Sequence, residues 1–153
     1  MCIRDRYFDT SKITVVLTAE ASGIALATIC AQKYGVPMLF AKKAKSDNIE
    51  SGLYQSEVFS YTYKKRVTLL VSQEWLNADD HVLIIDDFMA NGFAVQGLVD
   101  IVNEAGAKLE GIGIAVEKGF QGGGDRFRAS GIPYKALAVI EKADENGFVF
   151  REE

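Results

Sequence analysis

Two adjacent carboxylates and a loop of small residues lie together near the middle of the chain. Residues 82–85 form a continuous apolar run, typical of a strand buried on both faces, and Asp86 and Asp87 follow it directly. The loop at 90–94 then leads into apolar residues at helical spacing, and the free backbone N–H groups at a helix start can bind a phosphate. Two carboxylates would repel that anion, so we expect them to hold sugar hydroxyls or a cation beside it. A ribose phosphate carries both kinds of group and is the ligand that this pattern favours.

These groups need a fold that brings several loops to one edge. Short apolar, β-branched runs alternate with segments of helical periodicity, and this repeated strand–helix–strand order predicts an α/β domain. Ligands in open α/β sheets bind outside the carboxyl ends of the strands, where Asp86 and Asp87 are expected. We predict strands at 13–18, 37–41, 82–85, 109–116, 134–140 and 148–150, and helices at 24–34, at 93–105 and before Gly131.

A second turn, at 19–23, follows the first predicted strand and opens the first helix. Its amides would point into the same crevice as the loop at 90–94. The alternative is an ordinary strand-to-helix turn in which Ser22 caps the helix. Lys118 lies just past another predicted strand and would reach the same edge, although a lysine in such a position is more often a solvated surface charge.

A polar, charged and aperiodic segment at 42–51 is expected to form a mobile loop, and mobile loops often carry function. Its lysines, Lys42, Lys43 and Lys45, either neutralise a bound anion or serve solubility alone. Lys42 and Lys43 directly follow a predicted strand, which favours them over Lys45 for a functional role.

Two further segments flank the strand–helix repeat. Residues 56–63 and 67–71 lie on either side of a basic tip, which predicts a β-hairpin. The glycines at 122–124 are expected to form a flexible bend rather than another phosphate loop, because no matching helix start is recognised there.

The sequence Val-Leu-Ile-Ile-Asp-Asp-Phe-Met-Ala-Asn-Gly-Phe-Ala at 82–94 resembles the 5-phosphoribosyl 1-diphosphate binding motif of type I phosphoribosyltransferases. That motif has four apolar residues, two acids, two variable residues and then small residues around a glycine. The resemblance implies that Asp86 and Asp87 bind the ribose hydroxyls. It also implies that the 5-phosphate is bound by Ala90, Asn91, Gly92, Phe93 and Ala94, and the leaving diphosphate by Ala21, Ser22 and Gly23.

This chain departs from the family at three positions of the phosphate loop. The family usually has threonine where Asn91 and Ala94 stand, and glycine where Phe93 stands. Two hydroxyl donors are therefore missing, so backbone amides would carry more of the phosphate binding. The side-chain amide of Asn91 is a further donor.

The Ala-Asn-Gly version of the loop, together with Ile-Ala-Val-Glu-Lys-Gly-Phe-Gln at 114–121, resembles the bacterial xanthine phosphoribosyltransferase subgroup in particular. The similarity runs from about Ile13 to Phe150. It implies the type I phosphoribosyltransferase fold, a mainly parallel sheet flanked by helices with a flexible β-hairpin flap. It further implies a purine salvage reaction, in which xanthine and 5-phosphoribosyl 1-diphosphate give xanthosine 5'-monophosphate and diphosphate.

The same resemblance assigns further roles. Lys118 would hydrogen-bond a purine carbonyl, and Phe120 would stack on the base. Lys42, in the segment that resembles the catalytic flap, would join Asp86 and Asp87 in catalysis. Mg²⁺ would bind with 5-phosphoribosyl 1-diphosphate and be held mainly by that substrate. Relatives are usually homodimers, which we carry over as an expectation.

Composition limits the other possibilities. With 153 residues the chain is long enough for one core, and we predict a single domain at 13–153 behind an atypical or truncated leader at 1–12. Its 17 basic and 21 acidic residues give a net charge of −4, which argues against nucleic acid as a partner. The sequence has neither a long apolar run nor a secretory signal, so we expect a cytoplasmic location and no membrane partner.

Two other interpretations fit the same residues. One is a non-catalytic purine regulator that keeps the fold and binds 5-phosphoribosyl 1-diphosphate. It would need a DNA-binding partner segment, and the net negative charge argues against it. The other is an inactive fragment, suggested by the unusual first residues, MCIRDR.

Overall fold

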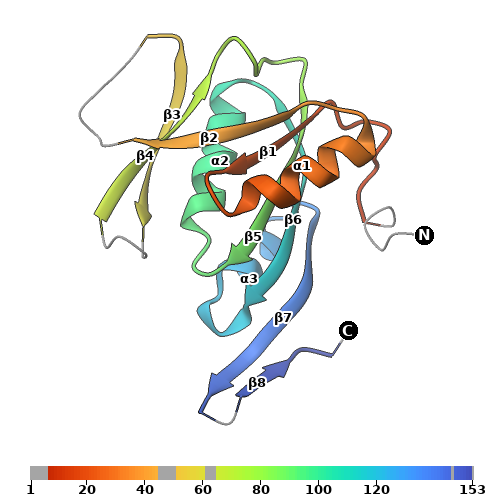
Figure 1. Ribbon diagram of the computed structural model, residues 1–153, viewed down its shortest axis with the longest axis vertical. Helices are drawn as coiled ribbons and strands as arrows, with labels where there is room; N and C mark the ends of the chain where they lie inside the picture. The colour runs from red at the N-terminus through yellow and green to blue at the C-terminus, as the bar shows by residue number, and fades with distance from the viewer. Residues whose placement is uncertain (1–6, 45–50, 61–64, 146, 153) are drawn as a thin grey trace.

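The computed structural model describes residues 7–44, 51–60, 65–145 and 147–152. Within these residues eight strands form one sheet in the order β3-β4-β2-β1-β5-β6-β7-β8 (Figure 1). The five central strands are parallel, and the pairings at both edges of the sheet are antiparallel. The parallel strands are β1 (Val15–Ala19), β2 (Met38–Ala44), β5 (His81–Met89), β6 (Lys108–Lys118) and β7 (Tyr134–Asp144); the others are β3 (Leu53–Ser60), β4 (Lys65–Ser72) and β8 (Gly147–Phe150).

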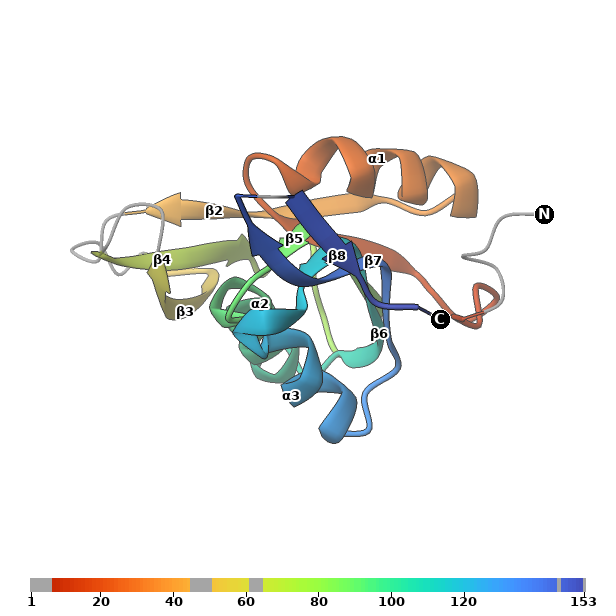
Figure 2. The ribbon, with the colours of Figure 1, turned by 90° about the horizontal axis from the view of Figure 1, so that it is seen from below.

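Helices cover both faces of this sheet. α1 (Gly23–Tyr34) lies on one face, and α2 (Phe93–Glu104) and α3 (Gly123–Ala129) lie on the other, as Figure 2 shows. α1 ends at Gly35, whose left-handed φ of 69° lets its N–H reach back to carbonyls of the last turn. The predicted α/β architecture is confirmed, because each parallel connection passes over the sheet as a helix or a long crossover.

Alternate residues of the central strands pack into two separate cores. In β5, Val82 and Ile84 belong to the larger core, which includes the buried side of α2. Leu83 and Ile85 belong to the second core, which includes Cys30 and the buried side of α1. Because successive side chains point to opposite faces of a strand, burial on both faces explains why this strand is apolar throughout.

The predicted hairpin is formed by β3 and β4, and it extends the main sheet. β4 pairs antiparallel with Lys42–Ala44 of β2. The prediction that a loop begins at Lys42 is therefore wrong, because pairing with β4 carries the strand on through Ala44. The centre of that predicted loop, at 45–50, and the hairpin tip at 61–64 lie outside the described residues, as do residues 1–6 of the predicted leader.

The glycines at 122–124 begin α3 and do not form the predicted bend. Gly122, with a φ of 75°, is the residue that caps the helix, and Gly123 and Gly124 form its first turn. The close packing here leaves no room for a side chain, since a Cβ on Gly123 would lie 2.3 Å from the carbonyl oxygen of Ala90. The sequence did not indicate this helix start, because a run of glycines usually marks a turn.

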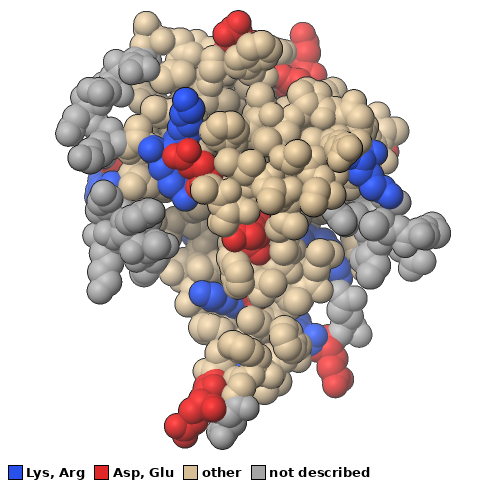
Figure 3. Space-filling view, in the orientation of Figure 1, with Lys and Arg blue, Asp and Glu red and all other residues tan. Residues whose placement is uncertain are grey.

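Among the described residues, every helix is too short or too polar to cross a bilayer. On the face shown in Figure 3, the described charged side chains form small separate groups among wide uncharged areas. Among the described residues of that face, the charges form no continuous basic band of the kind that binds a nucleic-acid backbone.

Candidate functional site

The carboxyl ends of β1 and β5 meet beside the start of α1. A Cβ on Gly23 would lie 2.2 Å from Oγ1 of Thr18 and 2.5 Å from Oδ1 of Asp86. The turn that holds Ala21, Ser22 and Gly23 therefore lies directly against the first of the two acids. Ser22 makes no side-chain capping hydrogen bond, so the geometry does not support a role for Ser22 as a simple helix cap.

Asp86 is a buried carboxyl group at the end of the apolar run of β5. Its side chain is 7% exposed, and Oδ1 accepts a hydrogen bond of 3.0 Å from the backbone N–H of Asp87. Burial, followed by the nearby Asp87 carboxylate, raises the pKa of Asp86 to about 7, while that hydrogen bond and the charge of Lys43 oppose the shift. A carboxyl group that titrates near neutral pH can either donate or accept a hydrogen bond with a sugar hydroxyl.

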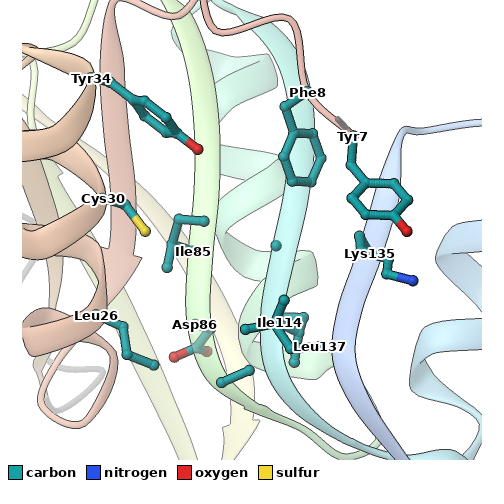
Figure 4. A pocket seen from close by; sticks show the side chains of 12 residues that line it. Tyr7, Phe8, Leu26, Cys30, Tyr34, Ile85, Asp86, Ile114, Lys135 and Leu137 are labelled. Carbon is teal, nitrogen blue, oxygen red and sulfur yellow. The ribbon is translucent and has the colours of Figure 1, made fainter. Parts of the chain in front are cut away.

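An apolar pocket on the α1 side of the sheet ends at Asp86. In Figure 4, Leu26, Cys30 and Tyr34 of α1 form one wall, and Phe8 lies across from them over the strands. Because these neighbours cannot solvate a charge, the pocket explains why burial is the main cause of the raised pKa of Asp86.

The loop at 90–94 presents backbone amides at the start of α2. Gly92 caps this helix with a left-handed φ of 79°, and the first helical hydrogen bond runs from Gln96 N–H to Gly92 O at 2.9 Å. The N–H groups of Phe93 and Ala94 therefore have no acceptor within the helix. They lie at the positive end of the helix dipole, which suits a phosphate.

A cavity between this loop and the β3–β4 hairpin is lined by Lys43. Lys43 pairs with Leu69 of β4 and shares its side of the sheet, whereas Lys42 alternates to the opposite side and does not line the cavity. The backbone N–H of Lys43 donates to Oε1 of Glu20 at 2.6 Å, which ties the turn at 19–23 to β2. The structure thus brings Lys43, rather than Lys42, to the site.

Lys118 and two exposed aromatic rings occupy the end of β6. Lys118 is the last residue of this strand, and Phe120 lies in the short 3₁₀ helix η2 (Gly119–Gln121) that follows. The ammonium group of Lys118 is 5.5 Å from the ring centre of Phe88, a cation–π contact. Phe88 is 50% exposed and Phe120 is 52% exposed, so both rings could stack on a flat base. Sequence reasoning missed Phe88, whose one signal was its place directly after Asp87.

Glu117, next to Lys118, is the centre of a buried ionic network. It is 0% exposed, and Arg128 of α3 binds it through both guanidinium nitrogens, at 2.9 Å (Nη1–Oε1) and 2.5 Å (Nη2–Oε2). The hydroxyl of Tyr134 donates to Oε2 at 2.9 Å. The hydrogen bond to Glu117 raises the pKa of Arg128, and burial, followed by the charge of Glu117, raises the pKa of Tyr134.

This network fixes α3 against the strands β6 and β7. A Cβ on Gly124 would lie 2.2 Å from Oε1 of Glu117, so the first turn of α3 packs directly on the carboxylate. Sequence reasoning missed the network as well, since its only local signal was an acid immediately after a predicted buried strand. The partner residues lie far enough along the chain that no short pattern joins them.

Two acidic side chains at this site could contribute to holding a metal ion. No three His, Cys, Asp or Glu side chains in the part of the chain that the structure describes gather into a metal-binding group. Asp86 and Asp87 are two adjacent carboxylates, and Mg²⁺ typically takes one or two carboxylates from a protein while substrate phosphates and waters complete its shell. These residues fit a magnesium ion that arrives with a phosphorylated ligand.

One family model and several curated proteins match this chain in sequence. The family model described as a phosphoribosyl transferase domain matches residues 2–142. A xanthine phosphoribosyltransferase of Bifidobacterium longum is 53% identical over 136 residues, which cover 88% of this chain and 70% of that protein. A xanthine phosphoribosyltransferase of Ruminiclostridium cellulolyticum is 52% identical over 147 residues, which cover 96% of this chain and 77% of that protein.

Solved structures share the arrangement of strands and helices. The APRTase of Giardia lamblia complexed with 9-deazaadenine matches with a TM-score of 0.77 at 22% identity, covering 92% of this chain and 76% of that one. The adenine phosphoribosyl transferase of Trypanosoma brucei, in complex with AMP, pyrophosphate and ribose-5-phosphate, matches with a TM-score of 0.73 at 26% identity. This match covers 94% of this chain and 64% of that one. Both likenesses confirm the fold predicted from the sequence.

Proposed function

This chain belongs to the phosphoribosyl transferase domain family and has its type I fold, and on this premise we propose that it is a purine salvage enzyme that acts on xanthine. It transfers the phosphoribosyl group of 5-phosphoribosyl 1-diphosphate to the base, giving xanthosine 5'-monophosphate and diphosphate. The observation that carries the proposal is the close approach of Gly23 to the Asp86 carboxylate, because it joins a candidate diphosphate turn to a candidate ribose acid.

In this reaction a purine nitrogen displaces diphosphate at C1 of the ribose. The C–N bond forms as the C–O bond breaks, the electron pair leaves with the diphosphate oxygen, and the proton of the attacking nitrogen is released to water. Little covalent chemistry is asked of the protein, so orientation and electrostatic stabilisation supply the catalysis. Asp86 and Asp87 hold the ribose hydroxyls, and this contact fixes C1 relative to both the base and the leaving group.

The phosphate groups bind at two helix starts. Amides of Ala90, Asn91, Gly92, Phe93 and Ala94 hold the 5-phosphate, and those of Ala21, Ser22 and Gly23 hold the diphosphate. Lys43 faces the loop cavity and adds positive charge there, with Lys42 beside it on the opposite side of β2. Mg²⁺, when it is bound with the substrate, neutralises part of the diphosphate charge.

The base lies at the end of β6. Lys118 donates to a purine carbonyl, and the exposed rings of Phe88 and Phe120 pack on the flat base. Hypoxanthine and xanthine share one ring carbonyl, so the choice of xanthine rests on the relatives rather than on Lys118. The names of relatives at about 50% identity support the same choice and favour an enzyme over the non-catalytic regulator.

The proposal includes three features that rest on the sequence and the family. Residues 13–153 act as one domain, the enzyme works in the cytoplasm, and two copies form a homodimer. Sedimentation velocity tests the last feature, and a species of about 17 kDa alone would contradict it, given the chain mass of 16.8 kDa.

Calorimetric titration with Mg²⁺ and 5-phosphoribosyl 1-diphosphate tests the sugar-phosphate site. The parent chain is expected to bind, and a variant with Asp86→Asn and Asp87→Asn is expected to lose binding while keeping its fold. Asp79→Asn, an exposed carboxylate on another loop, is the matched control and should bind like the parent. Binding by the double variant at the parental affinity would contradict the assignment.

A further inference from the structure

The phosphate loop of this chain has few side-chain donors of its own. Ala90, Phe93 and Ala94 carry no polar side-chain atom, and Gly92 carries no side chain. Backbone amides are therefore left with most of the binding of a dianionic phosphate. The groups that contact the loop from neighbouring elements become important for that reason.

Arg126 of α3 contacts this loop from behind. Its Nη2 donates to the carbonyl oxygen of Gly92 at 3.3 Å, and the same carbonyl accepts the first helical hydrogen bond of α2, from Gln96. The guanidinium carbon is also 5.9 Å from the ring centre of Phe93 and 5.3 Å from that of Phe127. Arg126 is thus held by one polar and two aromatic contacts.

The hydrogen bond from Arg126 to Gly92 affects the donor strength of the next backbone N–H, that of Phe93. The carbonyl of Gly92 belongs to the same peptide unit as the N–H of Phe93, which has no acceptor within the helix. A cation that donates to the carbonyl oxygen polarises that peptide and makes its N–H a stronger donor. Its charge also adds to the positive potential at the helix start.

α3 is held firmly enough to keep Arg126 in place. At its start, Gly123 N–H donates to the carbonyl of Ala90 at 3.2 Å. At its end, Arg128 is bound to the buried Glu117 through both guanidinium nitrogens. The helix is therefore fixed both to the phosphate loop and to β6, and Arg126 lies between these two attachments.

We propose that Arg126 is a positioning residue for the ribose 5-phosphate, acting through the peptide between Gly92 and Phe93. This inference rests on the proposed function and adds a residue that the phosphate-loop motif does not contain. From a separate helix, Arg126 compensates for the absence of the two hydroxyl donors that this loop lacks.

Ligands that carry only one of the two phosphate groups test the proposal. The parent, Arg126→Gln and Arg126→Lys are titrated with ribose 5-phosphate and, separately, with Mg²⁺-diphosphate. Arg126→Gln should weaken the binding of ribose 5-phosphate about tenfold, because the Phe93 N–H loses its polarisation and the helix start loses a nearby positive charge, and leave diphosphate binding within about twofold. Arg126→Lys should restore part of the loss, because the charge is kept without the planar fork.

Lys108→Gln is the matched control. It removes one positive charge at the opposite end of β6, beside Glu110, and should leave the binding of both ligands unchanged. Equal affinity of the parent and Arg126→Gln for ribose 5-phosphate would overturn the proposal and leave the proposed function standing. Equal weakening of both ligands would also overturn it, since that pattern marks a general structural role. If the parent binds neither ligand, the proposed function fails with it.

Discussion

The carboxylate of Asp86 lies against the α-carbon of Gly23, so close that a single added methyl group would sit 2.5 Å from Oδ1. The two residues are far apart in the sequence and end different strands. Their contact joins the turn after β1 to the acids after β5 into one site. It also explains why position 23 must be a glycine although its backbone is helical.

Gly23→Ala tests this contact. In an exposed helical position the change would stabilise the protein by up to about 1 kcal/mol. Here the added methyl group meets Thr18 and Asp86, so we expect a loss of about 1–3 kcal/mol in the free energy of unfolding and a loss of sugar-phosphate binding. Urea denaturation and calorimetry measure the two effects. Ala25→Ser, at an exposed position of the same helix, should change neither, and a stabilised Gly23→Ala variant that still binds would contradict the contact.

Asp86→Asn should stabilise the protein in a pH-dependent way. The folded carboxyl keeps its proton up to a pKa of about 7, while the unfolded one loses it near its ordinary value of 3.8. Between these values the folded state binds more protons, so the parent loses stability as pH rises through this window. The variant lacks this loss, and its advantage should grow from about pH 4 to a plateau above pH 7, on the order of 2–4 kcal/mol.

Urea denaturation from pH 4.5 to 8 measures this advantage. Asp79→Asn serves as the control, because its carboxylate is exposed and the difference from the parent should stay flat across the range. A flat difference for Asp86→Asn would mean that the buried carboxyl does not hold its proton.

Glu117→Gln should destabilise the fold strongly. The change leaves the guanidinium of Arg128 without its bidentate partner in a partly buried place, and breaking such a pair from one side costs about 3 kcal/mol. Glu141→Gln, which removes the exposed partner of Arg151, is the control and should cost less than about 1 kcal/mol. Thermal unfolding compares the two variants, and similar melting temperatures would contradict the central role of the network.

Lys118→Met should weaken purine binding and spare the sugar phosphate. A hydrogen bond from a charged donor contributes about 1.5–3 kcal/mol, so the KM for xanthine should rise roughly 10- to 100-fold. The affinity for 5-phosphoribosyl 1-diphosphate should stay within about twofold. Lys142→Met is the control in steady-state kinetics, because Lys142 is an exposed lysine of β7 that pairs with Asp144; it should change neither KM. A rise in the KM for the sugar phosphate alone would contradict the assignment of Lys118 to the base.

Much of this fold could be predicted from local sequence patterns. The apolar run at 82–85 is buried on both faces, and the apolar spacing after Phe93 matches the buried side of α2. Both patterns reflect which residues are buried, so the bounds predicted for this strand and this helix agree with those of β5 and α2 to within a few residues. The turn at 19–23 and the acids at 86 and 87 were also predicted to share one edge of the sheet, and Gly23 does lie against Asp86.

What the sequence did not reveal depends on contacts between distant residues. Lys42–Ala44 continue β2 because β4 pairs with them, and their own composition does not indicate a strand. α3 begins with glycines because the carbonyl of Ala90 and the carboxylate of Glu117 leave no room for side chains there. Glu117 of β6 pairs with Arg128 of α3, and no periodic sequence pattern relates a residue of a strand to a residue of the helix that follows it.

Product formation is the direct test of the proposed reaction. The purified chain is incubated with Mg²⁺, xanthine and 5-phosphoribosyl 1-diphosphate, and chromatography follows xanthosine 5'-monophosphate. We predict that the nucleotide and diphosphate appear in equal amounts, and that Asp86→Asn combined with Asp87→Asn slows their formation by at least about 10²- to 10³-fold. If the parent forms no nucleotide, or if the double variant forms it at an unchanged rate, the proposed reaction is wrong.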